Sequence, residues 1–147
     1  MIILAGLTFL IIVAIAGLHL AWAMGSVFPA RDEGELARTV TGFHLQDRMP
    51  PPSASLAVAV ALFMAALAAL ALGMGAYGPG RDALNVGGAL LSLLFFLRGV
   101  AGYTAYWRHL TPEEPFATYD RRYYSPLSIF LGLCFLILTI SHSTLGS

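Results

Sequence analysis

Charged residues are scarce in this sequence of 147 residues, and lysine is absent altogether. Asp, Glu, Lys and Arg together make up 11% of the chain, whereas a soluble globular domain carries about 25%. Hydrophobic residues make up 58%, and the eight basic side chains balance the eight acidic ones, so no net charge attracts a polyanion. This composition excludes a soluble globular domain, a disordered chain and a nucleic-acid-binding protein.

Cysteine and the known cofactor motifs are also missing or rare. Cys134 is the sole cysteine, so no internal disulfide can form, and cysteine usage does not indicate whether the protein lies in an oxidising or a reducing compartment. The histidines follow neither the His-Glu-x-x-His pattern nor a clustered Cys/His spacing; they are His19, His44, His109 and His142. A P-loop, a dinucleotide fingerprint and a Gly-x-Ser-x-Gly elbow are absent from the sequence as well. We therefore expect no metal, no haem and no other cofactor.

Long hydrophobic segments, in contrast, are abundant. A membrane-spanning helix needs roughly 20 consecutive apolar residues, because each residue adds about 1.5 Å and the hydrocarbon layer is about 30 Å thick. Four segments satisfy this length: residues 2–24, 54–76, 83–105 and 126–145. Only the third contains a charged residue, Arg98. The sequence therefore predicts an all-α polytopic membrane protein, a single-domain antiparallel bundle of four transmembrane helices.

The ends of these segments carry residues that begin or stop helices. The triplet Pro50-Pro51-Pro52 closes the first loop, because proline has a fixed φ and no amide proton. Gly78-Pro79-Gly80 predicts a tight turn before the third helix, and Asp82 is a candidate N-cap. Ser125 followed by Pro126 fits an N-cap and a first helical position, so we expect the fourth helix to begin there.

The distribution of arginines predicts the orientation in the membrane. The first and third loops hold six arginines, and the second loop holds one, Arg81; the six are Arg31, Arg38, Arg48, Arg108, Arg121 and Arg122. Because positively charged loops stay in the cytoplasm, we expect the two long loops there and both termini outside, in a bacterial inner membrane.

Small residues recur on two of the helices and predict where helices contact one another. The second has Ala57, Ala61, Ala65, Ala69 and Gly73, and the third has Gly88, Ser92, Gly99 and Gly102. We interpret both stripes as contacts within one chain. The alternative is a seam in a homo-oligomer or in a larger membrane complex.

Polar residues collect at one end of the predicted bundle. They are His19, Trp22, Arg98, Tyr103, Asp120 and Tyr124, and we take all six as candidate ligand-binding residues. Arg98 lies roughly 10 Å inside the third segment from residue 105, so it either snorkels to the headgroups or faces the bundle. Asp120 could orient His19 as a general base or pair with an arginine, and we favour a structural Asp120–Arg98 pair.

Arg121 and Arg122 are candidate lipid-headgroup ligands. They immediately precede the predicted N-terminus of the fourth helix, where free amide protons and the helix dipole favour a phosphate group. Membrane lipid is therefore the expected partner. The alternative is that the two arginines only set the orientation of the chain.

Two stretches of the C-terminal half resemble a known family. The stretch Phe96–Tyr103 reads FLRGVAGY, and the stretch Phe116–Leu127 reads FATYDRRYYSPL. Together they resemble a family of small bacterial four-helix membrane proteins catalogued as domain of unknown function 3995. The resemblance implies a four-helix architecture and supplies no activity. It highlights a group of residues around the third and fourth helices: Arg98, Asp120, Tyr124, Ser125 and Pro126.

The N-terminal signature of that family is a His followed by a Trp, a Gly and a Pro, and it resembles His19, Trp22, Gly25 and Pro29 here. This chain departs from the family pattern at Ala21, where a tyrosine is frequent, and at Ser26, where a second glycine is frequent.

Two classes of function remain open from the sequence. The first is a non-enzymatic membrane protein, either a bundle that binds a lipid or a small hydrophobic ligand, or a subunit of a membrane complex. The second is a small membrane enzyme for a lipid-soluble substrate, with His19 as acid or base and Arg98 as an anion-binding group. That enzyme requires a cavity that is open to the cytoplasmic leaflet and lined by His19, Trp22, Arg98 and Tyr124. A transporter is third, since no broken helix or inverted repeat is evident.

Overall fold

The computed structural model describes residues 1–44, 47–75 and 78–144, and no strand occurs among them. Four helices are long and apolar enough to cross a membrane, which confirms the predicted all-α membrane fold. They are α1 (Ile2–Ala23), α3 (Pro52–Met74), α4 (Arg81–Ala101) and the helix Phe116–Thr144. The last of these comprises α6 (Phe116–Tyr119), the π-helical segment η1 (Asp120–Tyr124) and α7 (Ser125–Thr144). Two short helices, α2 (Glu33–Val40) and α5 (Ala105–Leu110), lie in the long connections.

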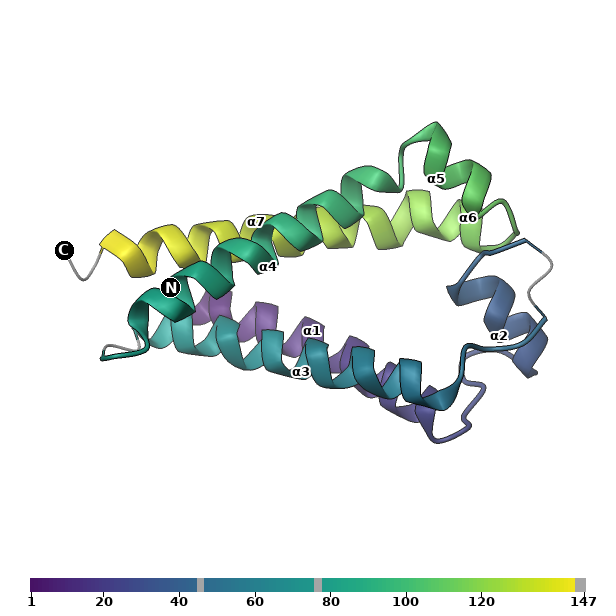
Figure 1. Ribbon diagram of the computed structural model, residues 1–147, viewed down its shortest axis with the longest axis horizontal. Coiled ribbons are helices and arrows are strands. Elements are labelled where there is room, and N and C mark those ends of the chain that lie inside the picture. The colour runs from purple at the N-terminus through teal and green to yellow at the C-terminus, as the bar shows by residue number, and fades with distance from the viewer. Residues whose placement is uncertain (45–46, 76–77, 145–147) are drawn as a thin grey trace.

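The four long helices form two antiparallel pairs (Figure 1). Helix α1 lies along α3, and α4 lies along α7. The N-terminus, the connection between α3 and α4 and the end of α7 lie at one end of the molecule, which we call the terminal end. Helices α2, α5 and α6 lie at the opposite end, the loop end, and the two pairs diverge toward it.

Small residues bring the helices of each pair into close contact. In the first pair, a Cβ at Gly73 would lie 2.1 Å from the Cβ of Ala5. In the second, Ser92 donates to the carbonyl oxygen of Gly132 over 2.8 Å, and a Cβ at Gly99 would lie 2.7 Å from the Ser125 carbonyl oxygen. The stripe on the third predicted helix is therefore a contact within the chain.

The stripe on the second predicted helix is only partly a contact. Ala65, Ala69 and Gly73 face the inside of the molecule or α1, whereas Ala57 and Ala61 are exposed. The buried face near the start of α3 instead contains Ser55 and Ala59. A strict four-residue repeat drifts around a helix of 3.6 residues per turn, so it cannot remain on one contact face over five members.

The third membrane helix ends earlier than predicted, at Ala101 and not at residue 105. A turn follows at Gly102, and Thr104 then adopts an extended conformation and caps α5 by accepting a hydrogen bond from the Trp107 amide over 3.2 Å. Threonine is a good N-cap because its hydroxyl satisfies an amide that has no partner in the first helical turn. Arg98 consequently lies in the last turn of α4, not 10 Å inside it.

The fourth membrane helix begins about ten residues before the predicted start at Ser125, because it includes α6 and η1. Ser125 has α-helical dihedral angles, so it is not an N-cap, and its amide donates to the Asp120 carbonyl in the wider π-helical pattern. Pro126 has no amide proton to donate, and a π-helical turn is one way in which a helix accommodates such a residue. Residue 76 of the second predicted helix and residue 145 of the fourth lie outside the described residues.

Helix α2 links the two pairs at the loop end. Asp32 caps it by accepting from the Glu35 amide over 2.8 Å. Its Leu36 and Ala37 are buried, and the carbonyl of Thr39 accepts a hydrogen bond from Tyr124 of η1 over 3.3 Å. The connection after α2 approaches α6, where Gly42 leaves room for the Phe116 ring.

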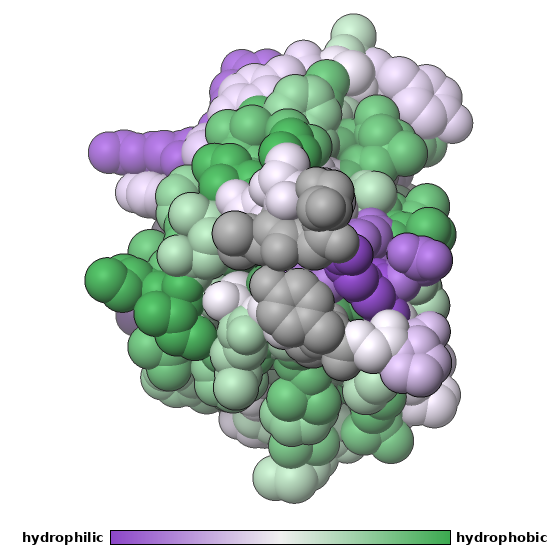
Figure 2. Space-filling view, turned by 90° about the vertical axis from the view of Figure 1, so that its left-hand side faces the viewer, coloured by the Kyte–Doolittle hydropathy of each residue, from purple (hydrophilic) through white to green (hydrophobic). Residues whose placement is uncertain are grey.

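Polar contacts at the terminal end join α4 to α7. Much of the described surface on this side is hydrophobic, with a hydrophilic group at the right of the centre and others at the upper left edge (Figure 2). Arg81 donates to the carbonyls of His142 and Ser143, which belong to the last turn of α7. His142 is buried and lies 2.7 Å from the amide oxygen of Asn85. Cations are favourable at a helix C-terminus, so these contacts join the ends of α4 and α7.

Candidate functional site

A fully buried carboxylate, Asp120, lies at the centre of the loop end. Its Oδ1 accepts from Arg98 Nη2 over 2.7 Å and from the Ser125 hydroxyl over 3.2 Å. Its Oδ2 accepts from the Trp107 indole over 3.0 Å and from Arg108 Nη2. The Asp120–Arg98 pair that we expected from the sequence is therefore present, and two further side chains of α5 join it.

This cluster forms because α4 ends at Ala101 and the chain turns before α5 begins. The turn at Gly102 changes the direction of the backbone, and Trp107 and Arg108 of α5 contact Asp120 of η1. The Arg98 guanidinium also lies 5.0 Å above the Trp107 ring, in a cation–π contact. The close packing of Ser125 against position 102 requires a glycine there, because a Cβ would lie 1.7 Å from the Ser125 hydroxyl oxygen.

The hydrogen bonds of Asp120 determine what it can do chemically. An ionised carboxylate offers about four acceptor positions, and four donors occupy them here. No position is left for a substrate proton or for His19. Asp120 is therefore a structural clamp that holds α4, α5 and η1 together, and not a general base.

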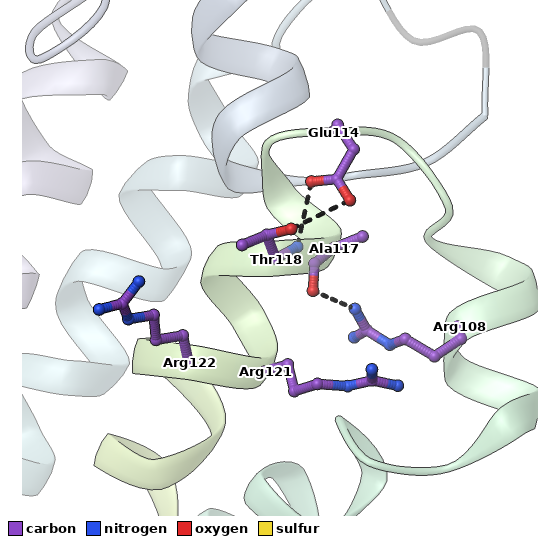
Figure 3. A pocket seen from close by; sticks show the side chains of 6 residues that line it. All are labelled: Arg108, Glu114, Ala117, Thr118, Arg121 and Arg122. Carbon is purple, nitrogen blue, oxygen red and sulfur yellow. Dashed lines mark hydrogen bonds between the residues drawn. The ribbon is translucent and has the colours of Figure 1, made fainter.

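Beside this clamp lies a pocket of about 280 Å³ (Figure 3). Its lining residues are Arg108, Glu114, Ala117, Thr118, Arg121 and Arg122. Arg108 is held in place by its second contact, a 2.9 Å hydrogen bond to the Ala117 carbonyl. Glu114 accepts from the amide and the hydroxyl of Thr118 over 3.2 and 3.1 Å. In Figure 3, the side chains of Arg108 and Arg121 extend to the same side of the helix, and Arg122 extends to the other.

The structure removes one argument for a headgroup site at Arg121 and Arg122. Both residues lie inside the helix and not before its N-terminus. The amide of Thr118, in the first turn, is already bonded to Glu114. Free helix amides are thus unavailable to a phosphate at these arginines, and only their guanidinium groups remain as donors.

The two candidate tyrosines lie at the edges of the cluster. The hydroxyl of Tyr103 donates to the Arg121 carbonyl over 3.1 Å, at an exposed position. Tyr124 is half-buried and contacts α2 through Thr39. Neither hydroxyl donates to Asp120.

His19 and Trp22 lie elsewhere, on the first helix pair. Their rings are 4.8 Å apart, and both line a pocket of about 140 Å³ between the end of α1, the end of α2 and the start of α3. Arg98 does not line that pocket, and its contacts are with Asp120 and Trp107 on the second pair. The cavity shared by His19 and Arg98, which the enzyme hypothesis requires, is therefore not formed by these two sites. Within the described ranges, no group of three His, Cys, Asp or Glu side chains is arranged to hold a metal ion.

The sequence did not reveal Trp107 and Arg108 as members of the cluster, whereas the family resemblance had already highlighted Ser125. Trp107 had the position of a membrane-interface aromatic, and Arg108 that of an ordinary loop charge. The signal that could have found them is the pair Gly102 and Thr104, a glycine followed by a good N-cap, which together indicate a helix break.

A family model described as "Protein of unknown function (DUF3995)" matches residues 12–135. This match includes α3 and α4 completely, parts of the first and fourth membrane helices, the lining of both pockets and the Asp120 cluster. No curated protein and no solved structure matches the chain.

Proposed function

The chain belongs to the DUF3995 family, and we propose that it is a membrane protein that binds an anionic lipid through the arginine-lined pocket at its loop end. The single observation that carries this proposal is the lining of that pocket, whose charged members are three arginines and one carboxylate: Arg108, Arg121, Arg122 and Glu114. The site is a binding site and requires no covalent chemistry.

The charges around the pocket favour an anion. Neither Arg121 nor Arg122 forms an ion pair within the part of the chain that the structure describes. The contact of Arg122 is with the Tyr123 ring, 5.4 Å from its centroid. Glu114 accepts hydrogen bonds from Thr118 and forms no ion pair with either of these arginines in the described part of the chain. An anion beside Arg121 would therefore add an attractive interaction without breaking an existing one.

The chemistry of arginine suits a phosphate headgroup. The guanidinium group presents parallel N–H donors that match two oxygens of one phosphate. Arg108 is already oriented by Asp120 and Ala117, so it loses little conformational freedom on binding.

The position of the pocket supports a lipid over a soluble anion. The pocket lies in the first turns of the membrane helix Phe116–Thr144, next to the exposed aromatic residues Tyr119 and Tyr123. Tyrosines concentrate at the headgroup level of a bilayer. Six of the eight arginines lie at this end, in α2, α5, η1 and the connections between the membrane helices, which favours the cytoplasmic face of a bacterial inner membrane, with both termini outside. Anionic lipids attract basic side chains near such a surface.

Native mass spectrometry of the protein, purified in detergent with added phosphatidylglycerol or phosphatidylcholine, tests the proposal. We expect the anionic lipid to be retained preferentially, and the Arg121→Gln/Arg122→Gln variant to retain it at least tenfold less. The matched control, Arg31→Gln/Arg48→Gln, removes two exposed arginines from the same end but outside the pocket, and we expect it to retain the lipid. Equal losses in both variants, or displacement of the lipid by millimolar inorganic phosphate, would overturn the proposal.

A further inference from the structure

The second pocket, beside His19, differs from the first in its chemistry. It has a volume of about 140 Å³ and no Asp, Glu or Arg side chain in its lining. Its walls are mostly apolar, with Val40, Met49, Pro50, Ala54 and Val58, and its polar members are His19, Trp22, Thr41 and Ser55. Such a lining disfavours a charged ligand, because the desolvation of a charge would find no compensating partner.

The hydrogen bond of His19 determines which of its ring nitrogens is available. Nδ1 lies 2.9 Å from the Ile15 carbonyl oxygen. A carbonyl can only accept, so in this hydrogen bond Nδ1 carries the proton. In the neutral ring, Nε2 is then an acceptor, and no hydrogen bond to it occurs among the described residues. A ligand that forms a hydrogen bond with His19 Nε2 must therefore be the donor of that bond.

The hydroxyl of Ser55 is a second group in this pocket that is available to a ligand. Ser55 is only 7% exposed, yet its hydroxyl forms no hydrogen bond within the described part of the chain. Helical serines commonly bond the carbonyl four residues earlier, and Ser55 does not. The Ser55 oxygen is not one of the enclosed polar atoms that lack a partner, so it is accessible from the pocket and can form a hydrogen bond with a ligand there.

Trp22 supplies a flat wall and has no free donor. Its indole N–H donates to the Phe28 carbonyl over 2.7 Å, which fixes the ring near the end of α1. The exposed faces of Leu20 and Val58 continue from this region along the outside of α1 and α3. An aliphatic tail could therefore leave the pocket into lipid while a ring remains against Trp22.

We propose that this pocket binds the ring of a neutral, lipid-soluble phenol or quinol, whose hydroxyl donates to His19 Nε2 and accepts from the Ser55 hydroxyl. The volume agrees with a single ring, since an engineered protein cavity of about 150 Å³ holds benzene. This site belongs to the α1–α3 pair, so it is independent of the arginine-lined pocket.

Calorimetric titration of the purified protein with 4-hexylphenol and with its methyl ether, 4-hexylanisole, tests the proposal. The two compounds share the ring and the tail, but only the phenol has a hydroxyl donor. We expect the native protein to bind the phenol at least tenfold more tightly than the ether. The variants His19→Phe and Ser55→Ala should each reduce this preference at least threefold, while Arg121→Gln/Arg122→Gln leaves it unchanged.

The protection of the buried Cys134 from a thiol reagent verifies that each variant is folded. Equal binding of phenol and ether by the native protein would overturn the proposal. So would a phenol preference that survives in both folded variants, or tighter binding of 4-hexylbenzoate, which carries a charge. A loss of phosphatidylglycerol retention with an intact phenol preference would refute the proposed function alone.

Discussion

Arg98 and Asp120 lie 22 positions apart in the sequence, and Arg98 Nη2 donates to Asp120 Oδ1 over 2.7 Å. This pair joins the last turn of α4 to the π-helical start of the fourth membrane helix. Arg108 and Trp107 bind the other carboxylate oxygen, so one side chain holds three helical segments together. The loop end of the molecule therefore depends on a single buried charge.

Replacement of Asp120 by Asn should destabilise the protein strongly. The variant leaves Arg98 and Arg108 beside a neutral group at a buried position, and breaking a buried ion pair in this way costs about 3–5 kcal/mol. Unfolding in mixed micelles with increasing dodecyl sulfate, followed by circular dichroism, measures the change. The control is Asp47→Asn, whose exposed pair with Arg38 should contribute less than about 1 kcal/mol. Similar losses in both variants would contradict the central role of Asp120.

Replacement of Arg98 by Leu should cost less than the loss of Asp120. Arg108 still neutralises the carboxylate in this variant, so no buried charge is left without an ion pair. Arg98→Lys should fall between the native protein and Arg98→Leu, because an ammonium group keeps the charge but not the planar contact with Trp107. The same unfolding titration ranks the three proteins. A larger loss for Arg98→Leu than for Asp120→Asn would show that Arg108 does not compensate.

Replacement by alanine should change the stability of the protein differently at two glycines of α4. At Gly99 a Cβ would lie 2.7 Å from the Ser125 carbonyl oxygen and 2.8 Å from the Ile129 amide nitrogen, and backbone atoms cannot turn away. We expect Gly99→Ala to destabilise the α4–α7 pair by about 1–3 kcal/mol. At Gly87 nothing lies within 4 Å of the added methyl group, so Gly87→Ala should be neutral or slightly stabilising. Equal effects in the unfolding titration would mean that α4 and α7 do not pack this closely in the membrane.

Cysteine labelling of intact bacteria that express the protein tests the proposed orientation. The exposed positions Ser143 and Asp47 lie at the terminal end and the loop end, respectively. A membrane-impermeant maleimide should label Ser143→Cys and not Asp47→Cys. The native Cys134 should remain unlabelled because it is buried in α7. The reverse pattern of labelling would place the arginine-rich end outside the cell.

The sequence predicted the four membrane helices well because their signal is local. Each needs only an apolar run of sufficient length, and the bilayer demands that such a run satisfy its own backbone hydrogen bonds. The helix ends were less predictable at two places. Ser125-Pro126 has the pattern of a helix start, yet the upstream residues continue the helix because Asp120, at their centre, is fixed by tertiary contacts. Residues 102–105 are apolar enough to prolong α4, but Gly102 and Thr104 end it.

The sequence predicted only those parts of the candidate site whose signal is local. Arg98 stood out in the sequence as the one charge in an apolar segment, and Asp120 as a nearby acid of opposite sign. The grouping of His19 and Trp22 with them rested on membrane depth alone. Depth places residues at the same level without deciding which helix pair they belong to, and the structure has them on separate pairs.

The scarcity of charge therefore determined, from the sequence by itself, that the chain is a four-helix membrane protein and that Arg98 is its exceptional residue. The tertiary structure alone decided that Asp120 collects four donors and that two chemically different pockets lie on different helix pairs. The physical reason is the range of the interactions. Insertion into a bilayer depends on the composition of each segment, whereas a hydrogen-bonded cluster depends on the turn at Gly102 and on the close contact that this glycine permits.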